Sequence, residues 1–293
     1  MAVKYLAGNR LWGTDAERLA LTTGTDTMGS GADGTNIGSP TSVSTPTTPS
    51  GLGDNSLHFI GSDQAIDING ALDFADSDAI GTISLWYYNT GTEESLTLMQ
   101  FAKNDDNTYL TFETRSDGND TIVMHRQATS GGLWEIRNAG SLSTSAWHHA
   151  VMSQNGTAVV CYVDGVELTS WDSDTDKSAW TTSSMNRGRI GCRDRGGYGN
   201  GGWIEGNIME VALWNVALSE AQVQDLWDSG DGKPATTYST GLRAYYTGDN
   251  IPATNEAVAV YPNLPNGTIF NETDTYKYFM FDGTDTWNQM VSS

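Results

Sequence analysis

Three acidic side chains stand at alternate positions in the stretch WDSDTDKSAW. They are Asp172, Asp174 and Asp176. In a loop, carboxylate oxygens at this spacing can reach a single ion, and Ca²⁺ prefers oxygen ligands. The glycine and the final glutamate of an EF-hand loop are absent, because Lys177 and Ser183 occupy those positions. We therefore expect Ca²⁺ as a candidate cofactor. The alternative is that these aspartates form a solvated acidic turn without an ion. The acidic turns at 104–107 and 116–120 are rival candidates for a Ca²⁺ site.

Two adjacent histidines, His148 and His149, could form a metal or catalytic pair. They lie in the pattern WHHAV, which is typical of a strand. Adjacent residues of a strand point to opposite faces of a sheet, so the two imidazoles cannot converge on one ion or proton without a bulge. We interpret His149 as a packed residue beside Trp147.

The glycine-rich stretch CRDRGGYGNGGW combines aromatic side chains with planar hydrogen-bonding groups. The residues of interest are Arg193, Asp194, Arg195, Tyr198, Asn200 and Trp203. Sugars stack their apolar faces on aromatic rings and form hydrogen bonds with guanidinium, carboxylate and amide groups. We expect this stretch to be a rim loop that binds a glycan. The alternative is a long hairpin loop whose aromatic residues pack on a neighbouring subunit.

The composition restricts the partners that the chain can have. Its net charge is −21, from 15 basic and 36 acidic residues, and this charge repels nucleic-acid phosphates. For any given carboxylate, a solvated surface adapted to salty surroundings is a better explanation than a dedicated acidic site. Apolar runs are too short for a membrane span or a signal-peptide core, so we expect a soluble, uncleaved chain. Cys161 and Cys192 are too few for a disulfide scaffold, and we expect two buried thiols.

The elements that position these residues are mostly short strands. Residues 56–250 alternate apolar and polar side chains in many runs separated by turn residues, which is typical of an antiparallel sandwich. Asn155-Gly156 and Asp164-Gly165 predict tight hairpins. One helix is predicted at 218–230, with Ser219 and Gln222 as capping box and Gly230 as its stop.

The segments before and after this region have a different character. Residues 1–21 predict an N-terminal appendage with a short strand at 4–13 and a capped helix at 14–21. Residues 22–55 are rich in Gly, Ser, Thr and Pro and predict a linker or arm. Residues 251–293 predict a small C-terminal β-meander.

Three stretches of the middle region occur in a familiar order. They are SLHFIGSDQAIDI followed by TISLWYYN, then STSAWHHAVMSQNGTAVVCYVDGVEL, then RIGCRDRGGYGNGGWIEGNIMEVALWNVALSEAQVQDLW. Together they resemble the laminin G-like domain of the concanavalin A-like lectin/glucanase superfamily. The resemblance implies an all-β, two-sheet antiparallel jelly roll, with Leu57, Phe59, Ile83, Leu85 and Ile208 in a shared core. In the last motif the family usually has an aspartate where this chain has Met209. The contact that the family makes through this aspartate is therefore in doubt for this chain.

The same superfamily contains glycoside hydrolases with a Glu-x-Asp-x-x-Glu pattern. A retaining mechanism needs two carboxyl groups about 5 Å apart. The nearest match is EGNIME, where Asn207 replaces the aspartate and Glu205 and Glu210 point to opposite faces unless a bulge intervenes. Because no other hydrolase or phosphate-loop motif occurs, we expect a non-enzymatic protein.

The C-terminal meander has two apolar faces. Its central strand carries Tyr276, Tyr278 and Met280 on one face and Lys277, Phe279 and Phe281 on the other, and Trp287 follows in the last strand. A sheet with one solvated face should alternate apolar and polar residues instead. We expect these aromatic and methionine residues to form an assembly surface against another subunit or protein.

The meander also resembles a segment of tailed-phage virion proteins. The shared features are NGTIF, an ETDT turn, an aromatic strand, and DG followed by Trp287; KYLAGNRLWGTDAERLAL is similar to the start of marine viral structural proteins. The resemblance implies a virion surface component, such as a decoration, fibre or spike protein, assembled in the host cytoplasm as a homo-oligomer with other virion proteins. The alternative is a secreted or cell-surface adhesin or filament subunit.

Overall fold

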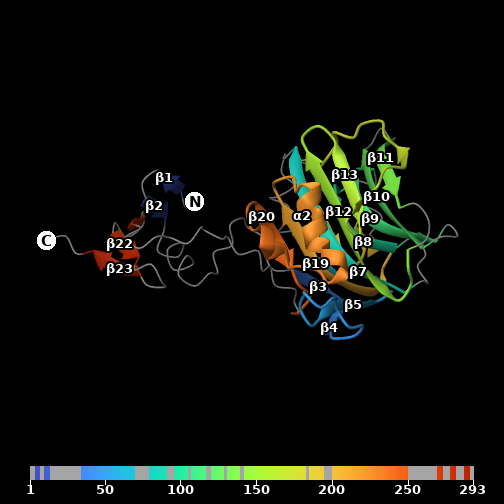
Figure 1. Ribbon diagram of the computed structural model, residues 1–293, viewed down its shortest axis with the longest axis horizontal. Coiled ribbons are helices and arrows are strands. Elements are labelled where there is room, and N and C mark those ends of the chain that lie inside the picture. The colour runs from blue at the N-terminus through green and yellow to red at the C-terminus, as the bar shows by residue number, and fades with distance from the viewer. Residues whose placement is uncertain are drawn as a thin grey trace. The chain divides into compact units, whose positions relative to one another are not determined.

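The computed structural model of the chain divides into two units (Figure 1). One unit contains residues 1–28 and 258–293, and the other contains residues 29–257. The structure describes residues 4–6, 10–13, 34–69, 79–90, 96–104, 107–116, 120–128, 131–138, 142–182, 185–194, 200–249, 269–272, 278–281 and 287–290.

The larger unit is an antiparallel sandwich of two sheets, which confirms the predicted all-β fold. Sheet I has the order β15 (Trp171–Ser173), β11 (Gly131–Arg137), β10 (Asp120–Ala128), β9 (Tyr109–Ser116), β8 (Leu96–Ala102), β16 (Arg187–Ile190), β6 (Ala65–Asp67), β3 (Thr35–Ile37). Sheet II has the order β14 (Val166–Glu167), β13 (Val159–Val163), β12 (Ala146–Asn155), β7 (Ile80–Asn89), β19 (Glu205–Trp214), β5 (Ser56–Ile60), β4 (Thr41–Val43), and β20 (Leu242–Tyr246) also pairs with β19.

The core lies between the two sheets. The five predicted core residues on β5, β7 and β19 are all buried there, and they face Phe101, Phe112 and Trp134 of sheet I. Alternate side chains of each strand enter this layer because the side-chain period of a strand is two. The predicted thiols of Cys161 and Cys192 are buried and unpaired.

Helix α2 (Glu220–Trp227) covers the outer face of sheet II, over β12 and β19 (Figure 1). Ser219 and Gln222 form the predicted capping box. The helix ends earlier than predicted, because Asp228 already adopts the left-handed conformation, with φ of 45°. Short 3₁₀ helices, η2 (Asp228–Gly230) and η3 (Ala235–Tyr238), then lead back to β20.

Residues 34–55 differ from the predicted linker, because they supply an edge strand to each sheet. β3 pairs with β6, and β4 pairs with β5. Edge strands are half exposed and need few large apolar residues, and their outer side tolerates proline nearby, so the composition resembles that of a linker. Pro40 lies between the two strands, where the chain passes from one sheet to the other.

The smaller unit contains a five-stranded sheet built from both ends of the chain. Its order is β1 (Lys4–Leu6), β2 (Arg10–Gly13), β21 (Ile269–Glu272), β22 (Tyr278–Phe281), β23 (Trp287–Met290). The predicted C-terminal meander is present, with shorter strands, and the single strand predicted at 4–13 is a hairpin. β2 pairs in parallel with β21. The helix predicted at 14–21, and Tyr276 and Lys277, lie outside the described residues.

No helix in the described ranges is long and apolar enough to span a bilayer.

Candidate functional site

A row of polar side chains crosses sheet I. Registered pairs connect neighbouring strands in the order Asp67, Arg189, Gln100, Thr111, His125, Glu135. We call these six residues the polar row. Their neighbours along each strand, such as Ile66, Ile190 and Phe112, belong to the core. Since successive residues of a strand alternate between faces, the polar row lies on the outer face of sheet I.

The centre of the polar row is almost completely buried. Gln100 is 1 % exposed and Arg189 is 5 % exposed. Arg189 forms ion pairs with Asp67 at 3.1 Å and with Asp194 at 2.6 Å. At the other end, Arg115 pairs with Glu135 at 2.9 Å. These pairs satisfy much of the buried charge, as buried ions require.

At the Arg189 end of the polar row, three buried N–H donors lack a hydrogen-bond partner in the described part of the chain. They are Gln100 Nε2, Arg187 Nε and Arg189 Nε. A buried donor without an acceptor costs about 1–3 kcal/mol, so each such group calls for an acceptor from water or a ligand. These N–H groups are themselves buried, so they mark a polar spot beneath the surface that a water molecule can satisfy.

The predicted glycan loop begins directly beside these donors. β17 (Arg193–Asp194) and β18 (Asn200–Gly201) form its hairpin. The Asp194 N–H donates to Gln100 Oε1 at 3.0 Å, and the Asp194 carboxylate holds Arg189. Asp194 thus anchors the loop, whereas Arg193 is exposed and Trp203 is half-buried. Arg195 and Tyr198 lie outside the described residues, and Asn200 is placed by its backbone only.

The polar row itself was not predicted. A signal was present, because Gln100 interrupts the apolar run LTLMQFA and Arg189 lies in the strand RGRI. Only strand register shows that these single polar residues are neighbours.

The three aspartates predicted to bind Ca²⁺ are not brought together. Asp172 pairs with Arg137, and Asp176 accepts hydrogen bonds from the N–H and hydroxyl of Ser178. Within the described ranges, no three His, Cys, Asp or Glu side chains form a group that could hold a metal ion. Ca²⁺ binding stays a prediction. The rival loops at 104–107 and 116–120 fall partly outside the described residues.

The two glutamates of EGNIME are far apart along β19. A bulge at Glu210, with φ of 53°, turns its carboxylate under α2, where the Tyr245 hydroxyl donates to it at 2.5 Å. Glu205 is exposed at the start of the strand. Five residues of strand span roughly 16 Å, well beyond the separation of a hydrolytic carboxylate pair. Asn207 donates to Ser56 Oγ at 2.9 Å.

The two histidines occupy different environments, as predicted. His149 stacks on Trp86, with ring centroids 5.0 Å apart, whereas His148 contacts Tyr87 and hydrogen-bonds Asp164 through Nδ1 at 2.7 Å. They do not converge on one ion.

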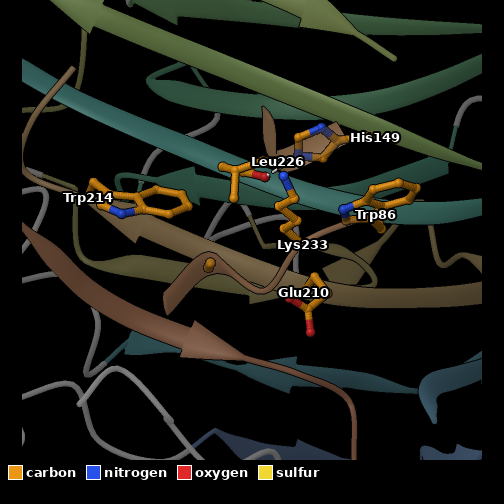
Figure 2. A pocket seen from close by; sticks show the side chains of 8 residues that line it. Trp86, His149, Glu210, Trp214, Leu226 and Lys233 are labelled. Carbon is orange, nitrogen blue, oxygen red and sulfur yellow. Dashed lines mark hydrogen bonds between the residues drawn. The ribbon is translucent and has the colours of Figure 1, made fainter. Parts of the chain in front are cut away.

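A small cavity lies between α2 and sheet II, bordered by Trp86, His149, Glu210, Trp214, Leu226 and Lys233 (Figure 2). Its volume is about 10 Å³, which leaves room for one water molecule at most. Burial lowers the pKa of His149 to about 3, so the imidazole is neutral. This cavity is too small for a sugar, and the outer face of sheet I remains the better candidate site.

Comparison with solved structures finds this fold in proteins of low sequence identity. Tailspike protein 2 of Escherichia coli O157:H7 bacteriophage CAB120 has a TM-score of 0.51 and 14% identity, covering 76% of this chain and 30% of that chain. Domain 4 of the arabinanase AbnA from Geobacillus stearothermophilus, in complex with arabinotriose, has a TM-score of 0.47 and 18% identity, covering 66% and 86%.

The K499G mutant of the sialidase NanB from Streptococcus pneumoniae has a TM-score of 0.47 and 18% identity. That match covers 58% of this chain but only 27% of the sialidase.

No curated protein sequence matches the chain. A family model described as the concanavalin A-like lectin/glucanases superfamily matches residues 60–224, which is more than half of the chain. The chain therefore belongs to the concanavalin A-like lectin/glucanases superfamily.

Proposed function

We propose that this chain is a non-enzymatic structural protein of a virion surface, such as a capsid decoration, fibre or spike protein. In this role the sandwich contacts glycans or a host surface. The sheet formed by β1, β2, β21, β22 and β23 joins the chain to further copies of itself or to other virion proteins.

The polar row carries the glycan-binding part of the proposal. It anchors the base of the 193–201 hairpin, because Asp194 pairs with Arg189 and its N–H donates to Gln100 Oε1. Sugar hydroxyls accept hydrogen bonds from guanidinium groups and also donate to carboxylates. Exposed Arg193 adds a planar guanidinium at the edge, which can form two parallel hydrogen bonds with a ligand.

The virion part is supported by both ends of the chain. The aromatic strand YFMF lies inside a five-stranded sheet that also includes the RLWG strand, and both segments resemble virion proteins. A bacteriophage tailspike shares the sandwich fold. Capsid, portal or tail genes beside this gene would add support, whereas a neighbouring secretion system would favour the secreted adhesin or filament subunit.

The separation of Glu205 and Glu210 supports a binding role over hydrolysis. Glu210 is engaged by Tyr245 beneath α2, away from Glu205 at the exposed start of the strand. A glycan bound beside Arg193 therefore meets no pair of carboxylates from this motif at hydrolytic distance.

A binding assay tests the glycan proposal. The full chain is titrated with a panel of neutral and acidic oligosaccharides, and Arg193→Ala is expected to weaken binding about tenfold because one charge-assisted hydrogen bond is lost. The matched control is Arg243→Ala on β20 of sheet II, which should bind as the wild type does. Recovered oligosaccharides should keep their length.

Equal binding by wild type and Arg193→Ala, or no binding across the panel, would contradict the assignment of this face. Shortened oligosaccharides, with turnover lost in Glu205→Gln, would instead favour the hydrolase alternative.

A further inference from the structure

A groove of about 320 Å³ opens at one edge of the sandwich, beyond the Glu135 end of the polar row. Arg137 and Asn138 at the end of β11 form one side. The β13–β14 hairpin and the connection from Leu168 to Ser170 form the other. The volume lies within the range of sites that hold small ligands, about 300–1,000 Å³. It is much larger than the cavity under α2.

The wall formed by the hairpin is held in place by its own contacts. Asp164 and Gly165 both have positive φ, 53° and 75°, which produces a tight turn. The Asp164 carboxylate accepts a hydrogen bond from the His149 N–H at 2.9 Å and binds His148 Nδ1 at 2.7 Å. Trp227 of α2 packs against Gly165. The hairpin therefore keeps its position without a ligand.

The opposite wall is also fixed. Arg137 Nε binds Asp172, and Arg137 Nη2 lies 3.4 Å from Glu135 Oε1. Asn138 Oδ1 accepts a hydrogen bond from the Ile122 N–H at 2.7 Å. A ligand entering the groove meets groups whose orientation is already determined, so little conformational entropy is lost on binding.

The lining mixes apolar and hydroxyl-binding groups. Val166 and Leu168 provide apolar surface, while Asp164, Glu167 and Thr169 offer oxygen atoms. Among the described residues of the lining, two carboxylates stand against one guanidinium, that of Arg137. Because the whole chain also carries a charge of −21, an anionic ligand is repelled. A neutral polyol can donate to the carboxylates, accept from the guanidinium and place its C–H face on Val166.

We propose that this groove is a second saccharide site, which binds one unit of a neutral sugar. The choice of ligand class rests on the proposed glycan-binding function, but the site is separate from the 193–201 hairpin. A protein with two such sites contacts a polysaccharide at two points, which raises its avidity without a new high-affinity contact.

The test is an NMR titration of the full chain, labelled with ¹⁵N, with glucose, galactose and arabinose, and with sialic acid as the anionic comparison. Neutral sugar should shift the amide signals of residues 164–170. Val166→Trp is expected to weaken this binding at least tenfold, because the indole fills the groove. Val166 is 66 % exposed on an edge strand, so the core is not disturbed. Ile60→Trp is the matched control, since Ile60 is 57 % exposed on β5.

The proposal is overturned if no neutral sugar shifts residues 164–170, if the shifts persist in Val166→Trp, or if sialic acid produces them equally well. Arg193→Ala separates the two sites. If it abolishes oligosaccharide binding but leaves the shifts at 164–170, both sites are supported. If Arg193→Ala leaves oligosaccharide binding unchanged while Val166→Trp abolishes it, the glycan site beside the polar row is wrongly assigned. The saccharide site in the groove is then supported.

Discussion

His149 is a titratable residue kept neutral by packing. Its ring stacks on Trp86, and its Nε2 lies 2.7 Å from Ser84 Oγ. Burial lowers its pKa from 6.5 to about 3, because the charged form would lose its hydration. Burial likewise raises the pKa of the Cys192 thiol to about 12, which leaves it a poor nucleophile at neutral pH.

Stability should depend on pH through His149. Below pH 6.5 the unfolded chain takes up a proton at this residue, and the folded chain does so only near pH 3. The contribution of His149 to the free energy of unfolding is therefore complete above pH 6.5. It falls by about 1.4 kcal/mol per pH unit as the pH drops toward 3. His149→Gln, which keeps a polar group near Ser84, should show a shallower fall.

The measurement is urea unfolding at pH 7.5, 6.5, 5.5 and 4.5 for the wild type and His149→Gln. Carboxylates titrate in both proteins, so the difference between the two curves isolates the histidine. Parallel curves would show that His149 has the same pKa in the folded and unfolded chains.

The two predicted hairpin turns depend on their glycines for different reasons. At Gly165 an added Cβ would lie 2.9 Å from Trp227 Cδ1, an atom of a packed indole. At Gly156 the nearest atom would be Ile80 Cγ1 at 3.3 Å, in a partly exposed and flexible side chain. Both glycines have positive φ. The 164–165 turn is therefore tied to α2, and the 156 turn is not.

Gly165→Ala should destabilise the sandwich more than Gly156→Ala does. Both substitutions place alanine in a left-handed conformation, at a cost of about 1–2 kcal/mol. The contact with Trp227 should add about 1–3 kcal/mol through overpacking for Gly165→Ala alone. Thermal and urea unfolding measure both variants, and equal losses of stability would mean that Trp227 moves aside without cost.

Local sequence patterns predicted the elements better than the site. The turn glycines and the capping residues Ser219 and Gln222 act within a few residues, so their pattern is visible in the sequence. The polar row depends on pairing between distant strands, such as Arg189 with Gln100, which no local pattern reveals. Asp194 also pairs with Arg189 and so anchors the loop, which the sequence did not indicate, and its contact with a ligand stays a prediction.

The whole molecule consists of a sandwich and a sheet that needs both ends of the chain. The prediction from sequence treated the N-terminal appendage and the C-terminal meander as separate segments. Their connection is the parallel pair β2 and β21, with Arg10 opposite Ile269. Such a contact joins residues at the greatest sequence separation and is hidden from any local analysis.

Deleting residues 258–293 should abolish oligomerisation while the sandwich still unfolds cooperatively. Deleting residues 1–28 should have the same effect, because β1 and β2 complete the same sheet. Light scattering after size exclusion measures the mass, and near-ultraviolet circular dichroism reports on the sandwich. A full oligomer after either deletion would mean that assembly uses another surface.

The parallel pairing of β2 with β21 also bears on synthesis. β2 leaves the ribosome before the sandwich is made, and β21 follows roughly 10–50 s later at 5–20 residues per second. During that interval the sandwich can fold, but the sheet that we propose for assembly has no third strand. A chain that terminates before β21 never forms this parallel pair, so the assembly that we propose requires translation through β21.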